Sequence, residues 1–203
     1  MIKDAFAERA AEWDQPSKID MTTRFINELK LNINVQASWK ALELGAGTGL
    51  AGLQLLPEIN SLVAEDTSVA MLNVLRSKLT GNEQVTIVEG EIFEYKQNDI
   101  DLLFSVMAFH HLPSLETALA HIAGLIKPGG YVVVGDLMPE DGSFHHFDPI
   151  PHTGFHPEEL KTKFEAVGFG VNKYYVYNTL TRERIPGKLS DYDQFILVAQ
   201  KPL

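Results

Sequence analysis

Cysteine is absent from the 203 residues of this chain, which excludes a disulfide framework and any thiolate metal site. Clusters of basic residues are also missing, because the 17 Lys and Arg are scattered and are outnumbered by 27 Asp and Glu. The net charge of -10 therefore argues against nucleic acid as a partner. No apolar stretch has the length of a signal peptide or a membrane span. We expect a cytoplasmic protein with small-molecule partners and no membrane association.

The composition is that of an ordinary globular domain, with 45% hydrophobic and 22% charged residues. The length suits one domain with a substantial core, and no repeat, low-complexity tract or linker divides residues 1–203. Residues 1–38 carry apolar side chains at helical spacings on both sides of Pro16. This pattern predicts an N-terminal part made of two helices.

After residue 38, short apolar runs alternate with helical patterns, which predicts a parallel sheet covered by helices on both faces. The last two runs are joined by a polar segment too short for a crossover helix, so we expect an antiparallel return there. The irregular stretch 139–155 is long enough to be a functional loop. The predicted strands are 40–44, 61–65, 84–89, 101–107, 131–137, 169–178 and 192–200, and the predicted helices are 49–56, 69–79, 115–126 and one that begins at Pro157.

The most informative segment is 41–53, where an apolar run with one acid breaks into alternate glycines. Glycine accepts positive φ and lets the backbone approach a ligand closely, and leucines at helical spacing follow, so a helix N-terminus would face that ligand. Gly47, Gly49 and Gly52 match the dinucleotide fingerprint G-x-G-x-x-G, with Asp66 about 20 residues later. One interpretation is therefore a nicotinamide-binding oxidoreductase.

A second register, Glu43-x-Gly45-x-Gly47-x-Gly49, places a carboxylate two residues before the first glycine. A carboxylate suits the cationic amino acid end of a ligand, whereas beside a pyrophosphate it would oppose the helix dipole and the backbone amides. The second register resembles the first motif of the class I S-adenosylmethionine-dependent methyltransferases. Glu43 favours this interpretation over the dinucleotide fingerprint.

Further segments resemble later motifs of the same family. Residues 63–68, Val-Ala-Glu-Asp-Thr-Ser, resemble the second motif, in which an acid, here Asp66, binds the ribose hydroxyls; Glu65 is expected to point to the other side of its strand. Residues 88–92, Val-Glu-Gly-Glu-Ile, resemble the third motif, in which an acid, here Glu91, reads the adenine amine. The resemblance implies a cofactor site made of Glu43, Gly45, Ala46, Gly47, Gly49, Asp66, Thr67, Glu91, Ile92, Ser105 and Met107.

The resemblance extends to most of the chain and implies a fold and a function. Residues 101–112 are similar to strand four and its loop in members that act on small molecules, and residues 125–134 contain a sequence motif common in the family. Residues 6–14 resemble the leader helices that cover the pocket in some members. The implied fold is an α/β single-domain Rossmann-like sheet of seven strands in the order 3-2-1-4-5-7-6, mostly parallel, with an antiparallel last strand. The implied function is transfer of a methyl group from S-adenosylmethionine to an unidentified small molecule, leaving S-adenosylhomocysteine. We expect a monomer or homodimer, with the acceptor between the N-terminal helices and the 139–155 loop.

Catalytic candidates are fewer, because methyl transfer from a sulfonium mainly needs alignment of the reacting atoms and a base is optional. His110 and His145 are candidates for a base or an acceptor contact, since histidine titrates near neutrality. Asp136, at the end of a predicted strand, is a third candidate, and its alternative is a solvated strand end. His146 and Trp13 are candidate acceptor contacts, although an aromatic such as Trp13 is more often packed against the core.

A metal site is not expected from the sequence. Adjacent histidines on an extended backbone point apart, so neither His110 with His111 nor His145 with His146 is expected to chelate an ion. A site would need side chains from separate loops to converge. Besides the oxidoreductase, a non-catalytic cofactor-binding regulator and a metal-assisted hydrolase built on the histidines remain alternatives.

Overall fold

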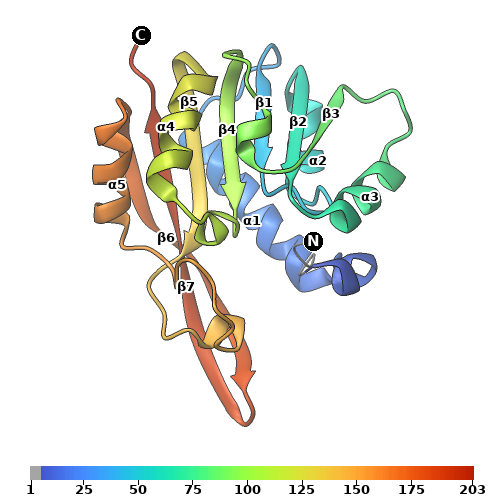
Figure 1. The fold of residues 1–203 in the computed structure, drawn as a ribbon, viewed down its shortest axis with the longest axis vertical. Helices are drawn as coiled ribbons and strands as arrows, with labels where there is room; N and C mark the ends of the chain where they lie inside the picture. The colour runs from blue at the N-terminus through green and yellow to red at the C-terminus, as the bar shows by residue number, and fades with distance from the viewer. Residues whose placement is uncertain (1–5) are drawn as a thin grey trace.

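The computed structural model describes residues 6–203, which form three layers, with one seven-stranded sheet between two layers of helices (Figure 1). The strand order is β3-β2-β1-β4-β5-β7-β6, and β7 runs antiparallel to both of its neighbours while the pairs from β3 to β5 are parallel. The predicted fold class and strand order are therefore confirmed. The strands are β1 (Lys40–Leu44), β2 (Ser61–Asp66), β3 (Val85–Glu89), β4 (Ile100–Val106), β5 (Ile126–Leu137), β6 (Gly170–Ile185) and β7 (Lys188–Gln200).

Helices cover both faces of the sheet (Figure 1). On one face lie α1 (Pro16–Asn32), α2 (Gly52–Leu55) and α3 (Val69–Lys78), and on the other lie α4 (Leu115–Leu125) and α5 (Pro157–Ala166). Five short 3-10 helices connect these elements: η1 (Ala7–Glu12), η2 (Leu56–Glu58), η3 (Ile92–Glu94), η4 (Phe109–His111) and η5 (Ser143–His145). Among residues 6–203, no helix is long and apolar enough to cross a membrane.

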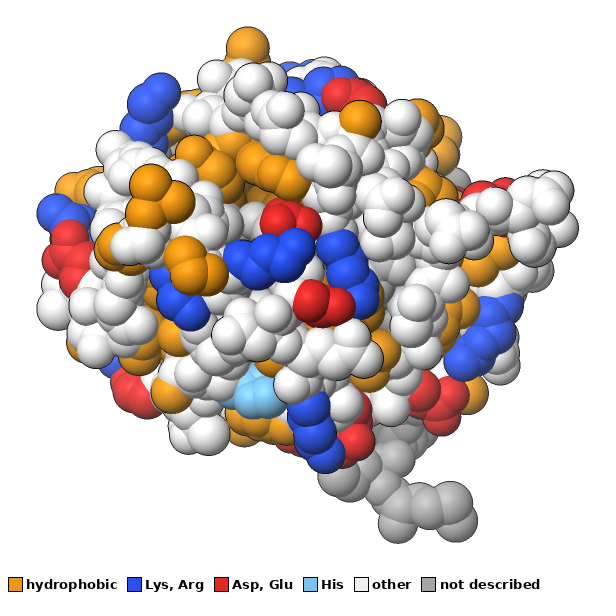
Figure 2. Space-filling view, turned by 90° about the horizontal axis from the view of Figure 1, so that it is seen from above, with side chains coloured by type: hydrophobic (Ala, Val, Ile, Leu, Met, Phe, Trp, Pro, Cys, Tyr) orange, Lys and Arg blue, Asp and Glu red, His pale blue; other side chains and the backbone are white. Residues whose placement is uncertain are grey.

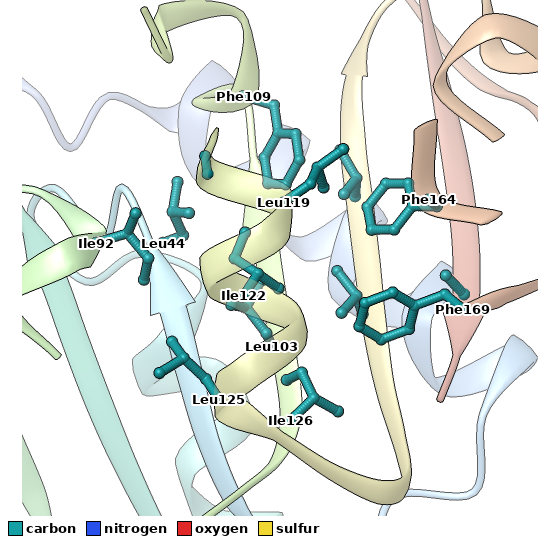
Figure 3. Close-up of a cluster of buried hydrophobic side chains, with 14 of the residues drawn as sticks. Leu44, Ile92, Leu103, Phe109, Leu119, Ile122, Leu125, Ile126, Phe164 and Phe169 are labelled. Carbon is teal, nitrogen blue, oxygen red and sulfur yellow. The ribbon is translucent and has the colours of Figure 1, made fainter. Parts of the chain in front are cut away.

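The sheet is apolar on both faces, as a sheet between two helical layers requires. Alternate residues of β4 enter different clusters, because Leu103 packs with α4 and α5 whereas Phe104 packs with α1. Figure 3 shows the first cluster, in which Leu119 and Ile122 of α4 point toward the sheet and Phe164 of α5 lies beside them. Burying one such side chain contributes about 1.5–3 kcal/mol. These clusters fix the strands whose ends form the candidate site.

Several predicted elements differ from the structure, and β5 begins at Ile126, five residues before the predicted strand 131–137. The helix predicted at 49–56 is shorter, since α2 ends at Leu55 and continues as η2, where Pro57 has no N–H for an α-helical bond. The first N-terminal helix is the 3-10 helix η1, and the first five residues of the predicted N-terminal part lie outside the described residues. The last two strands extend through the polar segment to a turn at residues 186–187, because cross-strand pairs such as Thr181 Oγ1 with Asp191 Oδ1, 2.6 Å apart, continue the hairpin.

The two ends of the sheet differ in character. Figure 2 looks down on the end where the parallel strands begin, and basic and acidic side chains lie next to one another there. Two ion pairs belong to this end: Lys40 Nζ lies 2.7 Å from Asp99, and Lys127 Nζ lies 2.9 Å from Asp101. At the opposite end, where the parallel strands finish, η1 lies beneath α3, and η5 lies beside the projecting β6–β7 hairpin (Figure 1). Candidate site residues concentrate at this second end.

Candidate cofactor and acceptor site

The glycine turn follows β1 at the carboxyl edge of the sheet. Gly45, Gly47 and Gly49 all have positive φ, of +73°, +54° and +81°. A Cβ added at Gly45 would lie 2.3 Å from the Cβ of Ala108, which follows β4, so a side chain cannot be accommodated there. The glycines thus let the turn bend and pass close to the end of the neighbouring strand.

Asp66 closes β2 and is held against this turn. Its carboxylate accepts the backbone N–H of Gly47 at 2.7 Å and that of Ser68 at 2.8 Å, and the residue remains partly exposed. Thr67 and Glu91 are exposed at the same edge, whereas Ile92 is buried. The acids predicted to bind the ribose and the adenine therefore lie at the ends of adjacent strands, and their binding roles stay predictions.

Two further carboxyl groups are buried beneath the turn. Glu43 is 2% exposed and its Oε2 has no hydrogen-bond partner among the described residues. Burial raises the pKa of Glu43 well above its usual value. Glu65 is 3% exposed, with its carboxyl 3.4 Å from the Gly45 nitrogen. Burial, followed by the charge of Asp66, raises the pKa of Glu65 to about 8, so Glu65 favours the protonated form at neutral pH.

Ser105 and Met107, predicted to border the cofactor, occupy different environments. Ser105 has no exposed surface, and its hydroxyl donates to the Leu44 carbonyl at 2.9 Å, joining β4 to β1. Met107 is partly exposed, and its φ of +58° is unusual for a residue with a side chain. Its N–H donates to the Gly135 carbonyl at 2.8 Å, which turns the chain into η4. Their predicted contacts with the cofactor stay predictions.

The histidines show where the expectation from sequence is wrong. His110 and His111 belong to η4 and not to extended backbone, so their rings lie side by side with centroids 4.2 Å apart. His145 of η5 joins them, because its Nε2 is 3.0 Å from Nε2 of His110. His146 turns away to the hairpin, where its Nδ1 is 3.1 Å from the Arg184 carbonyl oxygen. Two of the four rings expected to point apart therefore converge with a third.

Asp136 fixes the orientation of His110. Its carboxylate is fully buried and lies 2.6 Å from His110 Nδ1, while it also accepts the backbone N–H groups of His110 and Leu137. The alternative of a solvated strand end is therefore wrong. Burial, and then the neighbouring histidines, lower the pKa of His111 to about 3 and that of His145 to about 4. Both rings are neutral at physiological pH.

An N-terminal cover lies over this edge. Asp14, between η1 and α1, is held by Thr48 Oγ1 of the glycine turn and by Lys78 Nζ of α3, each 2.5 Å away. Phe6 packs edge-on against both Trp13 and His111, with ring centroids 5.7 Å apart in each pair. The segment before α1 thus bridges the glycine turn and the histidines, with Trp13 packed between aromatic and basic groups.

Four basic side chains lie near one another at this edge, and two of them, Arg9 and Arg184, act on the histidines, although the chain as a whole is acidic. Lys18 Nζ lies 2.6 Å from the Trp13 ring centroid, and Arg184 lies over the ring of Phe144 at 4.7 Å. Burial, and then the charges of nearby arginines, lower the pKa of Lys18 to about 7. Among the described residues none of the four forms an ion pair with a carboxylate, and Arg184 Nε is buried without a hydrogen-bond partner. We call them the basic group: Arg9, Lys18, Arg182 and Arg184.

The comparisons with known proteins agree with this architecture. Residues 42–134 match the family described as a methyltransferase domain. An uncharacterised methyltransferase of Oceanobacillus iheyensis is 35% identical over 105 residues, which are 50% of this chain and 48% of that protein. The chain spans about half the length of the curated relatives that it matches first.

Solved structures share the fold at lower identity. One chain in the structure of a complex between the Haloferax volcanii Trm112 methyltransferase activator and a putative methyltransferase superposes with a TM-score of 0.82 at 17% identity. The match covers 100% of this chain and 100% of that chain. A methyltransferase of Aquifex aeolicus described as SAM-dependent has a TM-score of 0.71 at 18% identity, covering 96% of this chain and 97% of its own. These likenesses establish the fold.

The glycine turn, flanked by acids, lies where the strand order of the sheet reverses, which is the place where open α/β sheets bind their ligands. Over residues 42–134 this chain is similar to the methyltransferase domain family, and the relatives and solved structures that it resembles include a methyltransferase that depends on S-adenosylmethionine. The residues present fit S-adenosylmethionine, because a buried Glu43 oxygen lacks a partner beneath the turn and a cationic ligand end beside it would favour the ionised carboxylate. The matched segment contains the whole glycine turn and ends before Asp136.

Sequence reasoning missed several residues that complete the site. Asp14, Thr48 and Lys78 tie the cover to the turn, yet no motif marks a contact across 34 residues of chain. His111 was set aside because its backbone was taken as extended, while the positive φ of Met107 that starts η4 has no sequence signature. For Arg184, a signal did exist in the alternation of arginines near the hairpin turn.

Proposed function

We propose that this protein transfers the methyl group of S-adenosylmethionine to a small-molecule acceptor. The observation that carries the proposal is the placement of Glu43, Asp66 and Glu91 at or beneath one sheet edge. They surround a glycine turn whose positive φ angles and close contacts disfavour larger residues. Each acid has a donor to match on the cofactor: the ammonium, the ribose hydroxyls and the adenine amine. A pyrophosphate in the same place would lie beside carboxyl groups, which disfavours the nicotinamide alternative.

The donor arrives already activated, so the chain has to hold it in line with the acceptor. When bound, S-adenosylmethionine would supply a methyl group that passes to the acceptor atom as the sulfur–carbon bond breaks, and a proton carried by the acceptor would be released to a neighbouring base. Alignment of this kind can supply about 7–11 kcal/mol of the barrier. His110, His145 and Asp136, joined in one hydrogen-bonded chain, support a role in holding the acceptor and receiving its proton.

The surroundings of the histidines favour an acceptor with a negatively charged group. The basic group projects from η1, α1 and β6, and a free carboxylate or phosphate would supply the partner that Arg184 Nε lacks. Trp13 lies among these side chains, which supports its predicted contact with the acceptor, and His146 lies beside Arg184. The acceptor pocket is thus proposed between the N-terminal cover, η4, η5 and the hairpin.

Calorimetry with S-adenosylhomocysteine, S-adenosylmethionine and NAD tests the cofactor, with Asp66→Ala as the informative variant. Loss of hydrogen bonds to a charged group costs about 1.5–3 kcal/mol, so we expect affinity for S-adenosylhomocysteine to fall roughly 10- to 150-fold. Glu65→Gln is the matched control, because it alters the neighbouring acid while keeping the shape of a protonated carboxyl, and its affinity should stay within about twofold of wild type at pH 7.

The result that would contradict the proposal is tight NAD binding without binding of S-adenosylhomocysteine. Equal losses in Asp66→Ala and Glu65→Gln would place the ribose contact elsewhere. Turnover is then measured with acceptors grouped by charge, and transfer from labelled S-adenosylmethionine to a carboxylate or phosphate compound is the expected outcome. A protein that binds the cofactor and methylates no member of any group behaves as the regulator alternative predicts.

A further inference from the structure

Three histidines converge at the carboxyl edge of the sheet from two separate turns. His110 and His111 lie in η4 and His145 lies in η5, and one ring nitrogen of each is within 4.8 Å of the others. We call them the three-histidine cluster. Imidazole nitrogens that converge from different segments are a common donor set for zinc and other first-row divalent ions. The cluster therefore has the composition and spacing of a metal site.

Asp136 prepares His110 for such a role. Its buried carboxylate receives two backbone N–H groups and lies 2.6 Å from His110 Nδ1, so Nδ1 carries the proton and donates it. The lone pair of His110 is then on Nε2, which faces His145. A ligand histidine held by a carboxylate on its other nitrogen is the usual arrangement around protein-bound metals, because it fixes the tautomer and the ring orientation.

The distance between the facing nitrogens is close to what one shared ion requires. Nε2 of His110 and Nε2 of His145 are 3.0 Å apart. Nitrogen ligands at about 2.0–2.1 Å from a tetrahedral zinc ion lie about 3.3–3.4 Å from each other. A shift of a few tenths of an ångström therefore converts this contact into joint coordination. His111, whose ring centroid is 5.2 Å from that of His145, is placed to give the third bond.

We propose that His110, His111 and His145 bind one divalent transition-metal ion, zinc by its ligand set, and leave a fourth position open. Three protein ligands with an open position are the pattern of a catalytic and not of a structural zinc site. Phe144 joins the cluster to Arg184, so an ion here has a cationic neighbour, which favours an anion as its fourth ligand. The open position suits the oxygen, nitrogen or sulfur of the acceptor, a role that rests on the proposed function, whereas binding of the ion does not.

Zinc titration of the full chain, prepared without a histidine tag and stripped of metal, tests the proposal directly. We expect one zinc ion per chain by calorimetry and by elemental analysis, and a cobalt-substituted protein with the absorption of a tetrahedral site. In His145→Ala the affinity for zinc should fall by more than about 100-fold, since loss of a ligand exceeds the 10- to 100-fold effect of an outer partner. Asp136→Asn, which keeps the ligands, should weaken zinc by about 10- to 100-fold.

His146→Ala is the matched control, because this exposed neighbour lies outside the three-histidine cluster and should leave zinc affinity unchanged. Absence of stoichiometric binding, or equal affinity in wild type and His145→Ala, would overturn the proposal and leave His110 and His145 sharing a proton. Binding of S-adenosylhomocysteine is measured on the same samples. Failure of the wild type to bind S-adenosylhomocysteine both with and without zinc would count against the proposed function, while zinc binding is judged on its own titration.

Discussion

Glu65→Gln is expected to change how the stability of this protein depends on pH. Glu65 is 3% exposed beneath the glycine turn, and its pKa is raised from 4.5 to about 8 by burial and by the charge of Asp66. A carboxyl group whose folded pKa is raised stabilises the fold fully below its unfolded pKa, and that stability is lost as the pH rises through the folded pKa. Gln mimics the protonated acid and cannot ionise, so the variant lacks this loss.

The magnitude follows from the two pKa values. Relative to a permanently ionised carboxyl, protonation of Glu65 contributes about 3 kcal/mol to the free energy of unfolding at pH 6 and less than about 1 kcal/mol at pH 8. The wild type should therefore lose about 2 kcal/mol more than Glu65→Gln between these pH values. Taking the difference between the two proteins removes the contributions of other groups, such as Lys18, whose lowered pKa acts in the opposite direction.

Urea unfolding at pH 6, 7 and 8, followed by tryptophan fluorescence, measures both proteins under matched conditions. The expected result is a gap in the free energy of unfolding that widens with pH in favour of Glu65→Gln. Parallel curves, with a constant gap from pH 6 to pH 8, would show that Glu65 is ionised in the folded protein and would refute the account of its burial. Asp66→Ala should flatten the wild-type curve in part, because a neighbouring negative charge is removed.

Two other predictions concern the acceptor side and the packing. Arg184→Gln should raise the KM for a carboxylate or phosphate acceptor by about 10-fold or more while leaving S-adenosylhomocysteine affinity unchanged, since a hydrogen bond to a charged group is worth about 1.5–3 kcal/mol. The control is Arg24→Gln, which only breaks an exposed ion pair with Asp20 at 2.9 Å. Equal KM values in the two variants would show that Arg184 does not bind the acceptor. Gly135→Ala places a Cβ 2.5 Å from the fully buried ring of Phe25 and should lower the free energy of unfolding by about 1–3 kcal/mol, whereas Gly124→Ala, which meets no atom within 4 Å in a helix, should not destabilise; urea unfolding compares the two, and similar stabilities would show that Phe25 yields.

The donor half of the fold could be predicted because its information is local. Glu43 and the alternate glycines lie within one turn, and Asp66 closes a strand whose apolar run is visible in the sequence. Hydrophobic alternation then fixes which face each strand buries, and thus the register of the sheet. The strand order itself came from the family resemblance and not from the pattern of residues.

The arrangement of His110, His145 and Asp136 could not be predicted in the same way, because it depends on contacts between distant segments. His110 and His145 are 35 residues apart, and their contact requires the η4 turn that begins at Met107. The extended-backbone assumption for His110 and His111 failed at that turn. Asp136 was singled out as a candidate, and its role stays a prediction, while its full burial beside His110 of η4 has no signal in the sequence.

The β6–β7 hairpin has two parts under different structural constraints. Near the core, Phe195 and Leu197 of β7 are completely buried and cannot change without disturbing the sheet. Beyond the edge, Arg182 and Arg184 stand on a ribbon whose two strands pair only with each other. Substitutions can therefore accumulate in this ribbon while the strand ends beside the glycine turn stay constant. Related chains could then bind the same methyl donor and differ in the molecule that they methylate.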